Sequence, residues 1–435
     1  MVGPPRRSLL GAACLLGAFA ALACQVDSKK IEEWKGTERG PGKIRSALRD
    51  GSLPASLRGQ AAAALAELGM LDELEADLKG LKLVEQQEIA HEAVPPLGKL
   101  AAGEDPAAPP TRAARSAKDA LFLLRGVAQP ADRDIIDDAL VKWVTVDLGA
   151  RAAAGSVGAE KIFQAAGSAR TGNALAPVAS APGANRNTAC ELLGRFGDAA
   201  ARDAAGQKLV AAARSERPPR EDTIKCLGQI GGKAATAYLM EVAEKADEKN
   251  RQRAVQAMEQ HPEPSALPFA LRLAGDHGQP GTVREEAFAL AERVGGEAAV
   301  QGLLPFLADP DKTVGRRAIE AALEAGKTAA IGPVLERVPA RLFQERDDVR
   351  DFLVRDLVKI GQPGLGPLRI ALGSKNPIAR VAAVMAIGEL GTRRDAAAVG
   401  KLARDGARLG MKGFPGDGTV GAEARAVLEK LKLKG

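Results

Sequence analysis

Aromatic residues are scarce in this chain: only 3% of its 435 residues are Phe, Trp or Tyr. Single-stranded nucleic acids bind to aromatic side chains on which their bases stack, so the composition offers no platform for such a ligand. The 61 basic and 55 acidic residues leave a net charge of +6, which describes a mixed surface and not the strongly basic patch that nucleic acids require. We therefore expect no nucleic-acid partner.

Histidine and cysteine are also few, with three and four residues respectively. His91-Glu92 begins like a zinc-protease helix, but Pro95 stands where the second histidine must lie one turn later. His261 and His277 have no partner at metal-ligand spacing, and no Gly-x-Ser-x-Gly motif is found. We expect no catalytic residue, no metal site and no cofactor, and we interpret the chain as not an enzyme.

Long apolar runs are missing except near the N-terminus, where Arg6 and Arg7 precede an apolar stretch over residues 9–21 that leads to Cys24. This pattern is typical of a secretory signal, and the stretch is shorter than the ~20 residues that a membrane-spanning helix needs. It resembles a bacterial lipoprotein signal, which implies that Cys24 becomes the lipidated first residue. Gln25 is not the Asp that retains many lipoproteins at the inner membrane, so we expect the periplasmic face of the outer membrane. An inner-membrane anchor and a secreted protein cut after Ala23 are the alternatives.

An arginine and a glycine eleven residues apart recur along the chain. The arginine column consists of Arg58, Arg186, Arg220, Arg284, Arg350 and Arg380. The glycines that close each unit are Gly69, Gly197, Gly231, Gly295, Gly326, Gly361 and Gly391. Gly326 departs from the pattern, because Gly315 stands eleven residues before it with Arg316 alongside, and Pro262 stands where a further glycine is expected.

Helical geometry explains this spacing. Positions eleven, eight, four and one before the glycine fall on one stripe of a helix, and small residues such as Ala61, Ala287 and Ala383 occupy the second of them. The glycine suits a left-handed residue just past the helix end, and a second amphipathic run follows it. Each unit is thus a helical hairpin of roughly 30 to 35 residues that must stack on its neighbours to bury its apolar side.

The pattern resembles HEAT repeats, in particular the short HEAT-like type found in PBS lyases. Matching pairs are Val283-Arg284 with Ala287 and Ala379-Arg380 with Ala383. The resemblance implies an all-α fold, a right-handed α-α superhelix of helical hairpins. In that family the comparable arginine pairs with an acid of the adjoining turn, for which Asp311, Asp347 and Asp348 are candidates here. We interpret the arginine column as scaffold, with an anion-binding row as the alternative.

Cys190 and Cys226 lie at inward positions of the first helices of successive units. An oxidising compartment permits a disulfide. Their different places relative to the closing glycines put them on different helix faces, so we expect buried free thiols and keep a disulfide as the alternative.

Composition divides the chain into six segments. They are a signal peptide (1–23), a polar tether (24–43), irregular N-terminal helical repeats (44–184), regular HEAT-like repeats (185–404), a Gly-rich loop (405–421) and a C-terminal capping helix (422–435). The Gly-rich loop is the candidate interaction loop, because Met411, Lys412 and Phe414 stand there in an otherwise polar setting. The alternative is a mere connector.

These features favour a non-enzymatic, lipid-anchored scaffold that binds an envelope protein or peptide, whose identity the sequence does not reveal. A HEAT-like lyase acting on tetrapyrroles, or another envelope enzyme, is one alternative. A module that binds cell-wall glycan is another, for which Trp34, Trp143 and Tyr238 are the stacking candidates.

Overall fold

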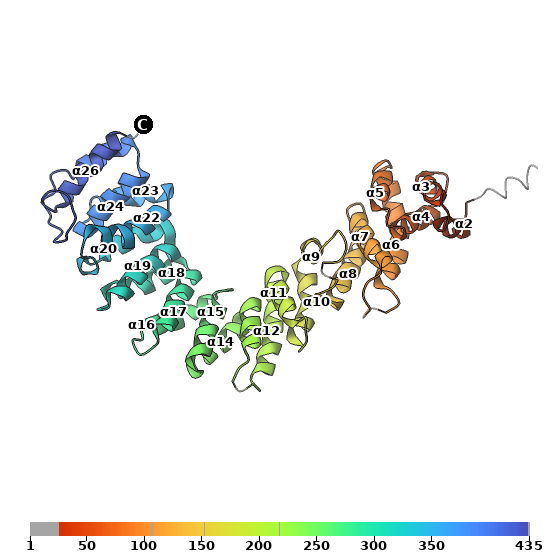
Figure 1. Ribbon diagram of the computed structural model, residues 1–435, viewed down its shortest axis with the longest axis horizontal. Helices are drawn as coiled ribbons and strands as arrows, with labels where there is room; N and C mark the ends of the chain where they lie inside the picture. Colours follow the sequence, from red (N-terminus) through yellow and green to blue (C-terminus); the bar gives the residue numbers. More distant parts are fainter. Residues whose placement is uncertain (1–25, 106–107, 152, 217, 434–435) are drawn as a thin grey trace, which may run out of the picture. The chain divides into compact units, whose positions relative to one another are not determined.

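The computed structural model describes residues 26–105, 108–151, 153–216 and 218–433. This part of the chain is built of α-helices and short 3₁₀ turns, without a strand, and its two isolated β-bridges join Glu345 to Lys412 and Arg408 to Thr419 (Figure 1). The all-α prediction is confirmed. The chain forms two compact units, unit 1 through Ala201 and unit 2 from Arg202 onward.

In unit 1, helices separated by short turns pack on one another in order: α4 contacts α6, α6 contacts α7, and α10 contacts α11. The helices are α2 (Ser28–Lys35), α3 (Gly40–Arg49), α4 (Ala55–Glu67), α5 (Leu71–Lys79), α6 (Leu83–Ala102), α7 (Arg112–Arg125), α8 (Pro130–Val146), α9 (Ala159–Ala166), α10 (Ser168–Ser180) and α11 (Arg186–Phe196). Helix α12 (Ala199–Ala213) contains the boundary between the two units.

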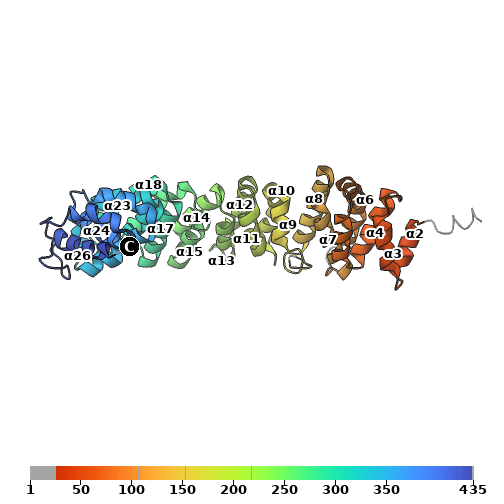
Figure 2. The ribbon, with the colours of Figure 1, turned by 90° about the horizontal axis from the view of Figure 1, so that it is seen from above.

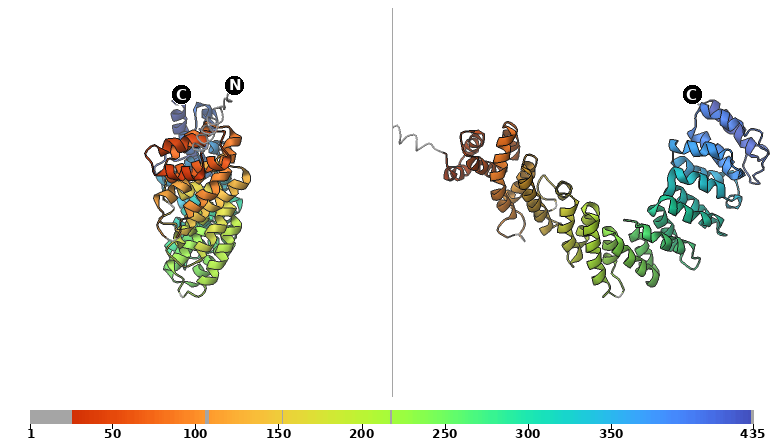
Figure 3. Two further views of the ribbon diagram at one scale, coloured as in Figure 1. Left: turned by 90° about the vertical axis from the view of Figure 1, so that its right-hand side faces the viewer. Right: turned by 180° about the vertical axis from the view of Figure 1, so that it is seen from behind.

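Unit 2 is a stack of helical hairpins, coloured from green to blue in Figures 2 and 3. Its helices are α13 (Glu221–Ile230), α14 (Lys233–Lys245), α15 (Glu248–Met258), α16 (Leu267–Gly275), α17 (Gly281–Val294), α18 (Gly296–Leu303), α19 (Lys312–Gly326), α20 (Ile331–Arg337), α21 (Arg346–Val349), α22 (Arg355–Lys359), α23 (Leu365–Ala371), α24 (Pro377–Leu390), α25 (Ala396–Gly400) and α26 (Val420–Lys432). A π-helical turn, η5 (Arg350–Val354), joins α21 to α22. Short 3₁₀ turns complete the unit: η1 (Pro264–Ala266), η2 (Leu304–Ala308), η3 (Lys327–Ala330), η4 (Ala340–Leu342), η6 (Gln362–Gly364) and η7 (Arg393–Asp395).

The core follows the stripe that the sequence predicts. Ala61, Ala189, Ala287, Ala318 and Ala383 are all fully buried. Small residues at this level allow neighbouring helices to approach closely. A Cβ atom at Gly228, for example, would lie 2.7 Å from the Cβ of Ala257 on the next helix of the stack. The first helix of each hairpin thus packs closely on the first helix of the next hairpin, and this packing holds the repeats together.

The predicted tether over residues 24–43 is wrong for the part of it that the structure describes. Asp27 accepts a hydrogen bond from the backbone N–H of Lys30 and starts α2, which buries Ile31 and joins Lys35 to Glu67 of α4 at 2.7 Å. α3 begins at Gly40. The short amphipathic pattern of α2 rests on one buried apolar residue, which is why composition suggested a flexible segment.

The predicted change from irregular to regular repeats at residue 185 also differs from the structure. The two units separate between Ala201 and Arg202. The Ala- and Gly-rich stretch before residue 185 forms most of α10, a helix that contains Pro177 in its last turn. The predicted capping helix corresponds to α26, which begins at Val420 behind the side-chain cap of Thr419.

Candidate functional site

Arg58, Arg284 and Arg380 of the arginine column contact the ends of preceding helices. Arg58 donates through Nε to the carbonyl of Leu48 in the last turn of α3, and Arg284 donates in the same way to Ala274 in the last turn of α16, each at 2.9 Å. Arg380 donates to the carbonyl of Ser374, just past α23, at 2.8 Å. The last carbonyls of a helix lack intrahelical partners and carry partial negative charge, so a guanidinium stabilises them.

Acidic partners are present at some of these arginines. Arg58 contacts Glu85 at 3.1 Å, and Arg380 contacts Asp405 at 2.6 Å. The more exposed Arg220 and Arg350 pair with acids near them in sequence, Asp222 at 2.6 Å and Asp347 at 3.1 Å. Of the three acids that the HEAT resemblance suggested, Asp348 pairs with Arg316 at 2.9 Å, whereas Asp311 caps α19 by accepting from the N–H of Thr313. Arg186 is buried, with 8% of its surface exposed.

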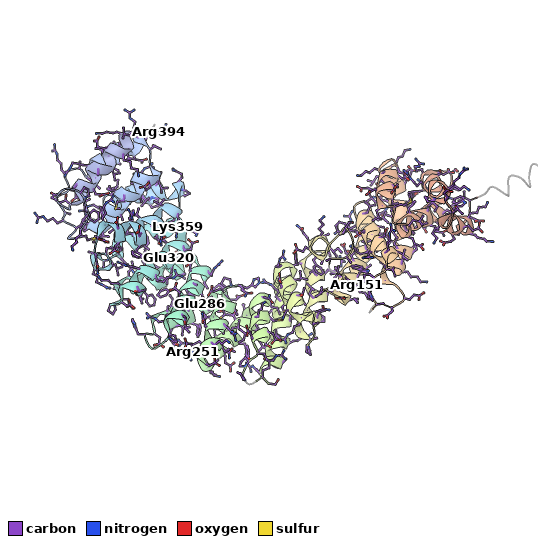
Figure 4. All side chains as sticks on the ribbon, in the orientation of Figure 1. Arg151, Arg251, Glu286, Glu320, Lys359 and Arg394 are labelled. Atoms are coloured by element: carbon purple, nitrogen blue, oxygen red, sulfur yellow. The ribbon has the colours of Figure 1, made fainter. Side chains whose placement is uncertain are left out.

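Sequence reasoning missed one member of this set. Arg251 stands eleven residues before Pro262, and its guanidinium donates to the carbonyl of Ala243 in α14 at 2.9 Å and to the carbonyl of Ala246 at 3.2 Å (Figure 4). The unit that contains Arg251 ends at Pro262 and not at a glycine, so the arginine–glycine spacing does not include this arginine. The eleven-residue spacing to Pro262 was the signal that could have found it.

The closing glycines divide into two groups. Gly69, Gly231, Gly295 and Gly361 have φ between 67° and 79°, as a helix stop in the left-handed region requires. Gly197, Gly326 and Gly391 do not. At Gly391 the reason for glycine is space, because a Cβ atom there would lie 2.6 Å from the carbonyl oxygen of Ile387. After Gly326 it is Lys327 that adopts positive φ, at 46°.

The candidate interaction loop folds back on unit 2. Its Phe414 is only 8% exposed, and Leu409 is buried as well. The N–H of Arg346 donates to the carbonyl of Lys412 at 2.9 Å, which fixes the loop against the first residue of α21. Met411 is half-buried and Lys412 is exposed. Of the three residues proposed for interaction, Phe414 is therefore not available as an exposed apolar contact, because backbone pairing turns it inward.

The three stacking candidates for glycan do not form a platform. Trp143 is 4% exposed and donates its indole N–H to the carbonyl of Ala101, and Tyr238 is 6% exposed and donates its hydroxyl to the carbonyl of Ala213. Trp34 is half-buried beneath the ammonium of Lys43.

Cys190 and Cys226 are both fully buried and both disulfide-bonded. The expectation of free thiols is wrong. Position along a helix gives the direction of a side chain within that helix, but not its distance from a side chain on another helix. Cys24 lies outside the described residues.

Charged side chains gather on one face of unit 2, where α15, α17, α19 and α22 follow one another in the stack. Gln252 and Gln256 of α15 donate to Glu286 of α17 at 3.1 and 2.5 Å. Arg317 of α19 reaches back to Glu292 of α17 at 3.2 Å. We call this surface the α15–α22 face and define it by the following residues: Glu259, Glu286, Glu292, Arg293, Arg317, Glu320, Glu324, Lys327, Asp356 and Lys359.

Burial alters the electrostatics of this face. Burial, with the charge of Glu286 nearby, raises the pKa of Glu259 to about 8, although Arg293 acts in the opposite direction. Burial also raises the pKa of Glu292 against the lowering effect of Arg317. Carboxyl groups with raised pKa values are held close together and partly out of water, where a cation would stabilise them.

A polar cavity of about 220 Å³ opens on the α15–α22 face. Its charged lining consists of Glu292, Glu320, Glu324, Asp356, Lys327 and Lys359. Glu320 and Lys359 are labelled on neighbouring helices in Figure 4. The acids outnumber the bases, so the cavity is suited to a cationic group.

A larger cavity of about 850 Å³ lies in unit 1 beside α8 and α10. Its Arg170 is already held by Asp134 at 2.8 Å, Asp138 at 2.7 Å and Asp137 at 3.2 Å. In the smaller cavity, by contrast, Asp356 keeps one buried carboxylate oxygen without a hydrogen-bond partner, so volume alone does not make the larger cavity the better candidate.

Sequence reasoning did not find the acids of the α15–α22 face. Glu259, Glu292, Glu324 and Asp356 follow one another at intervals of 33, 32 and 32 residues. That period equals one repeat and was the available signal. The recurring arginines and glycines stand at other positions and do not reveal these acids.

The described ranges contain no group of three or more His, Cys, Asp or Glu side chains placed to hold a metal ion. None of their helices has both the length and the apolar character needed to cross a membrane.

The hairpin stack and its charged face define the class of this protein as an α-solenoid with an extended surface. Residues 239–324, less than half of the chain, match the family of HEAT repeats. No curated protein matches the sequence.

Solved structures to which the chain is similar include the complex of CpcE and CpcF of phycocyanin lyase from Nostoc sp. PCC7120, at 19% identity and a TM-score of 0.28, covering 60% of this chain and 94% of that one. Human deoxyhypusine hydroxylase in complex with glycerol shares 16% identity with a TM-score of 0.26, covering 72% and 99%. The karyopherin Kap121p bound to the extreme C-terminus of the protein phosphatase Cdc14p shares 14% identity with a TM-score of 0.32, covering 97% of this chain and 48% of that one. At these identities and TM-scores the likenesses carry no conclusion about function.

Proposed function

We propose that this protein is a non-enzymatic scaffold, anchored by lipid in the bacterial cell envelope, that binds an envelope protein or peptide through the α15–α22 face. The observation that carries the proposal is the alignment of charged side chains from four successive repeats, held by contacts such as Arg317 to Glu292. Repeats contact only their neighbours in a solenoid, and the stack presents one continuous surface that no single hairpin offers. Side chains fixed in advance lose less entropy on binding.

The binding part is tested by affinity capture from envelope extract. The full-length protein is compared with a variant that carries Glu320→Lys and Glu324→Lys on the face. The matched control carries Glu75→Lys and Glu191→Lys, two exposed positions in unit 1. We expect one or more proteins to be captured by the wild type and the control and lost from the face variant. Capture of no reproducible partner would contradict the scaffold proposal, and equal capture by all three would move the binding surface elsewhere.

The anchoring part is supported by Arg6, Arg7, the apolar stretch after them and Cys24. We place the protein on the outer membrane, facing the periplasm. Intact-mass measurement of the protein purified from a Gram-negative host should find a chain that begins at Cys24 and carries acyl groups. A chain without acyl groups that begins at Cys24 would instead indicate secretion, and an uncleaved chain would indicate retention by the signal itself.

No observation favours the lyase alternative. The glycan alternative has lost its basis, because Trp143 and Tyr238 are buried. Protein binding is the function that the described geometry supports best.

A further inference from the structure

The cavity on the α15–α22 face contains a carboxylate oxygen with no hydrogen-bond partner. The side chain of Asp356 is 5% exposed, and Arg355 at 3.1 Å and Lys359 at 2.8 Å both contact its Oδ1. Its Oδ2 is buried and accepts no hydrogen bond. A buried carboxylate oxygen without a donor costs about 1–3 kcal/mol or more relative to a paired one, because it has lost its water. Asp356 lines the cavity, so a donor that binds there lies beside this side chain and pairs with Oδ2 once the carboxylate turns toward it.

The rest of the cavity complements a long cationic side chain. Glu320 and Glu324 of α19 supply further carboxylates, and Leu323 and Ile360 supply apolar surface between them. The volume of about 220 Å³ leaves room for a single side chain and not for a folded element. Long basic side chains bury an aliphatic stem against apolar surface and present their charge at the end.

Building on the proposed function, we infer that this cavity binds an arginine side chain of the partner, with the guanidinium donating to Asp356 Oδ2 and to Glu320. A guanidinium presents five N–H donors in a planar fork, so it can contact two carboxylates at once, whereas an ammonium is a point charge. Hydrogen bonds between charged groups are roughly twice as strong as neutral ones. Within the described part of the chain, the acids of the cavity do not form a group of three or more placed to hold a metal ion.

Lys327 stands at the rim of the cavity and pairs with Glu324. It is the one residue other than glycine with positive φ among those described, at 46°. Both Lys327 and Lys359 must share their carboxylates with an incoming guanidinium. Binding is consequently expected to weaken with added salt, because the charges at the rim are exposed to solvent.

The test uses the full-length protein and small probes observed by ligand-detected NMR. The probes are Nα-acetyl-arginine amide, the corresponding lysine amide, and the citrulline amide, which has nearly the shape of arginine without its charge. We expect the arginine probe to bind, the lysine probe to bind more weakly and the citrulline probe not to bind. Equal binding of arginine and citrulline, or of arginine and lysine, would overturn the assignment, as would full displacement of the arginine probe by millimolar calcium.

Variants locate the binding. Asp356→Asn keeps the shape and removes the charge, and we expect the arginine probe to bind at least about tenfold more weakly, equivalent to about 1.4 kcal/mol. Asp351→Asn is the matched control, since Asp351 is exposed, outside the cavity and paired with Arg350. Unchanged affinity in Asp356→Asn would overturn the inference. If Asp356→Asn does not fold, Glu320→Gln at the rim decides in its place, with the same tenfold loss expected.

Failure of this inference and failure of the proposed function are distinguishable. A partner captured from the envelope whose binding is unaffected by Asp356→Asn would leave the scaffold proposal standing and refute the arginine site. Specific binding of the arginine probe without any captured partner would support the arginine site and contradict the scaffold proposal.

Discussion

Replacing Glu259 by glutamine should stabilise the protein, and more so at higher pH. Glu259 lies just past α15, half-buried beside Glu286, and its pKa is raised from 4.5 to about 8. At a pH between these two pKa values, the carboxyl group of Glu259 keeps its proton in the folded state and has lost it in the unfolded state. Stability therefore falls as pH rises through that window and is constant above it. Glutamine keeps the shape, cannot ionise, and can still donate to Glu286.

The size of the effect follows from the same two values. At about 1.4 kcal/mol per pH unit, the interval from 4.5 to about 8 corresponds to a ceiling of about 5 kcal/mol. Because the side chain is partly exposed to solvent, screening reduces this to about 1–2 kcal/mol. For a unit of this size, 1 kcal/mol moves the melting temperature by about 2–4 °C.

The assay is thermal unfolding of wild type and Glu259→Gln at pH 4.5, 6.5 and 8.5. We expect no gain at pH 4.5, a partial gain at pH 6.5 and the full gain at pH 8.5. Glu248→Gln is the control, because Glu248 is exposed at the other end of the same helix. A gain of equal size at all three pH values, or a loss at pH 8.5, would refute the reasoning.

The remaining predictions concern the scaffold. Arg58→Ala should lower the free energy of unfolding by about 2–4 kcal/mol, because the buried guanidinium donates to both the carbonyl of Leu48 and Glu85. Chemical denaturation measures this loss. The control Arg115→Ala, at an exposed position, should change the free energy of unfolding by no more than about 0.5 kcal/mol. Arg380→Ala should cost about 3 kcal/mol at pH 7 and less near pH 3. Although burial acts to raise it, the pKa of Asp405 is lowered by the hydrogen bond from Arg380, so this contribution is lost as pH falls below about 4; a penalty independent of pH would argue against the ion pair. Thiol titration of unfolded, unreduced protein should find no free thiol from Cys190 or Cys226, and one equivalent from either would show that they are reduced.

The fold was predictable from sequence because its periodicity is strong. The eleven-residue spacing places an arginine near the start of a helix and a glycine at its end. The alanines between them, Ala287 and Ala383 among them, are buried as the spacing predicts. Asn376 accepts a hydrogen bond from the N–H of Ile378 and so caps the start of α24, which is a local feature of the kind that sequence displays. These features depend on residues close together in the chain.

What the sequence could not predict depends on residues far apart. Phe414 turns inward because the loop pairs with the segment at Glu345, about 70 residues earlier, and no local pattern shows that. The cavity at Asp356 combines side chains from α17, α19 and α22, each one repeat apart. The disulfide state of Cys190 and Cys226 likewise depends on distances between helices. The regular α2 escaped notice for a different reason, since its single buried residue, Ile31, is too little for a periodic signal.

Site-specific photocrosslinking in living cells tests the central claim most directly. A photoreactive amino acid in place of Arg293, exposed on the α15–α22 face, should crosslink to a protein partner in the envelope, whereas the same group in place of Glu75 in unit 1 should not. A discrete crosslinked product that forms only at position 293 is the predicted result. No product at position 293, or the same product from both positions, would contradict the account.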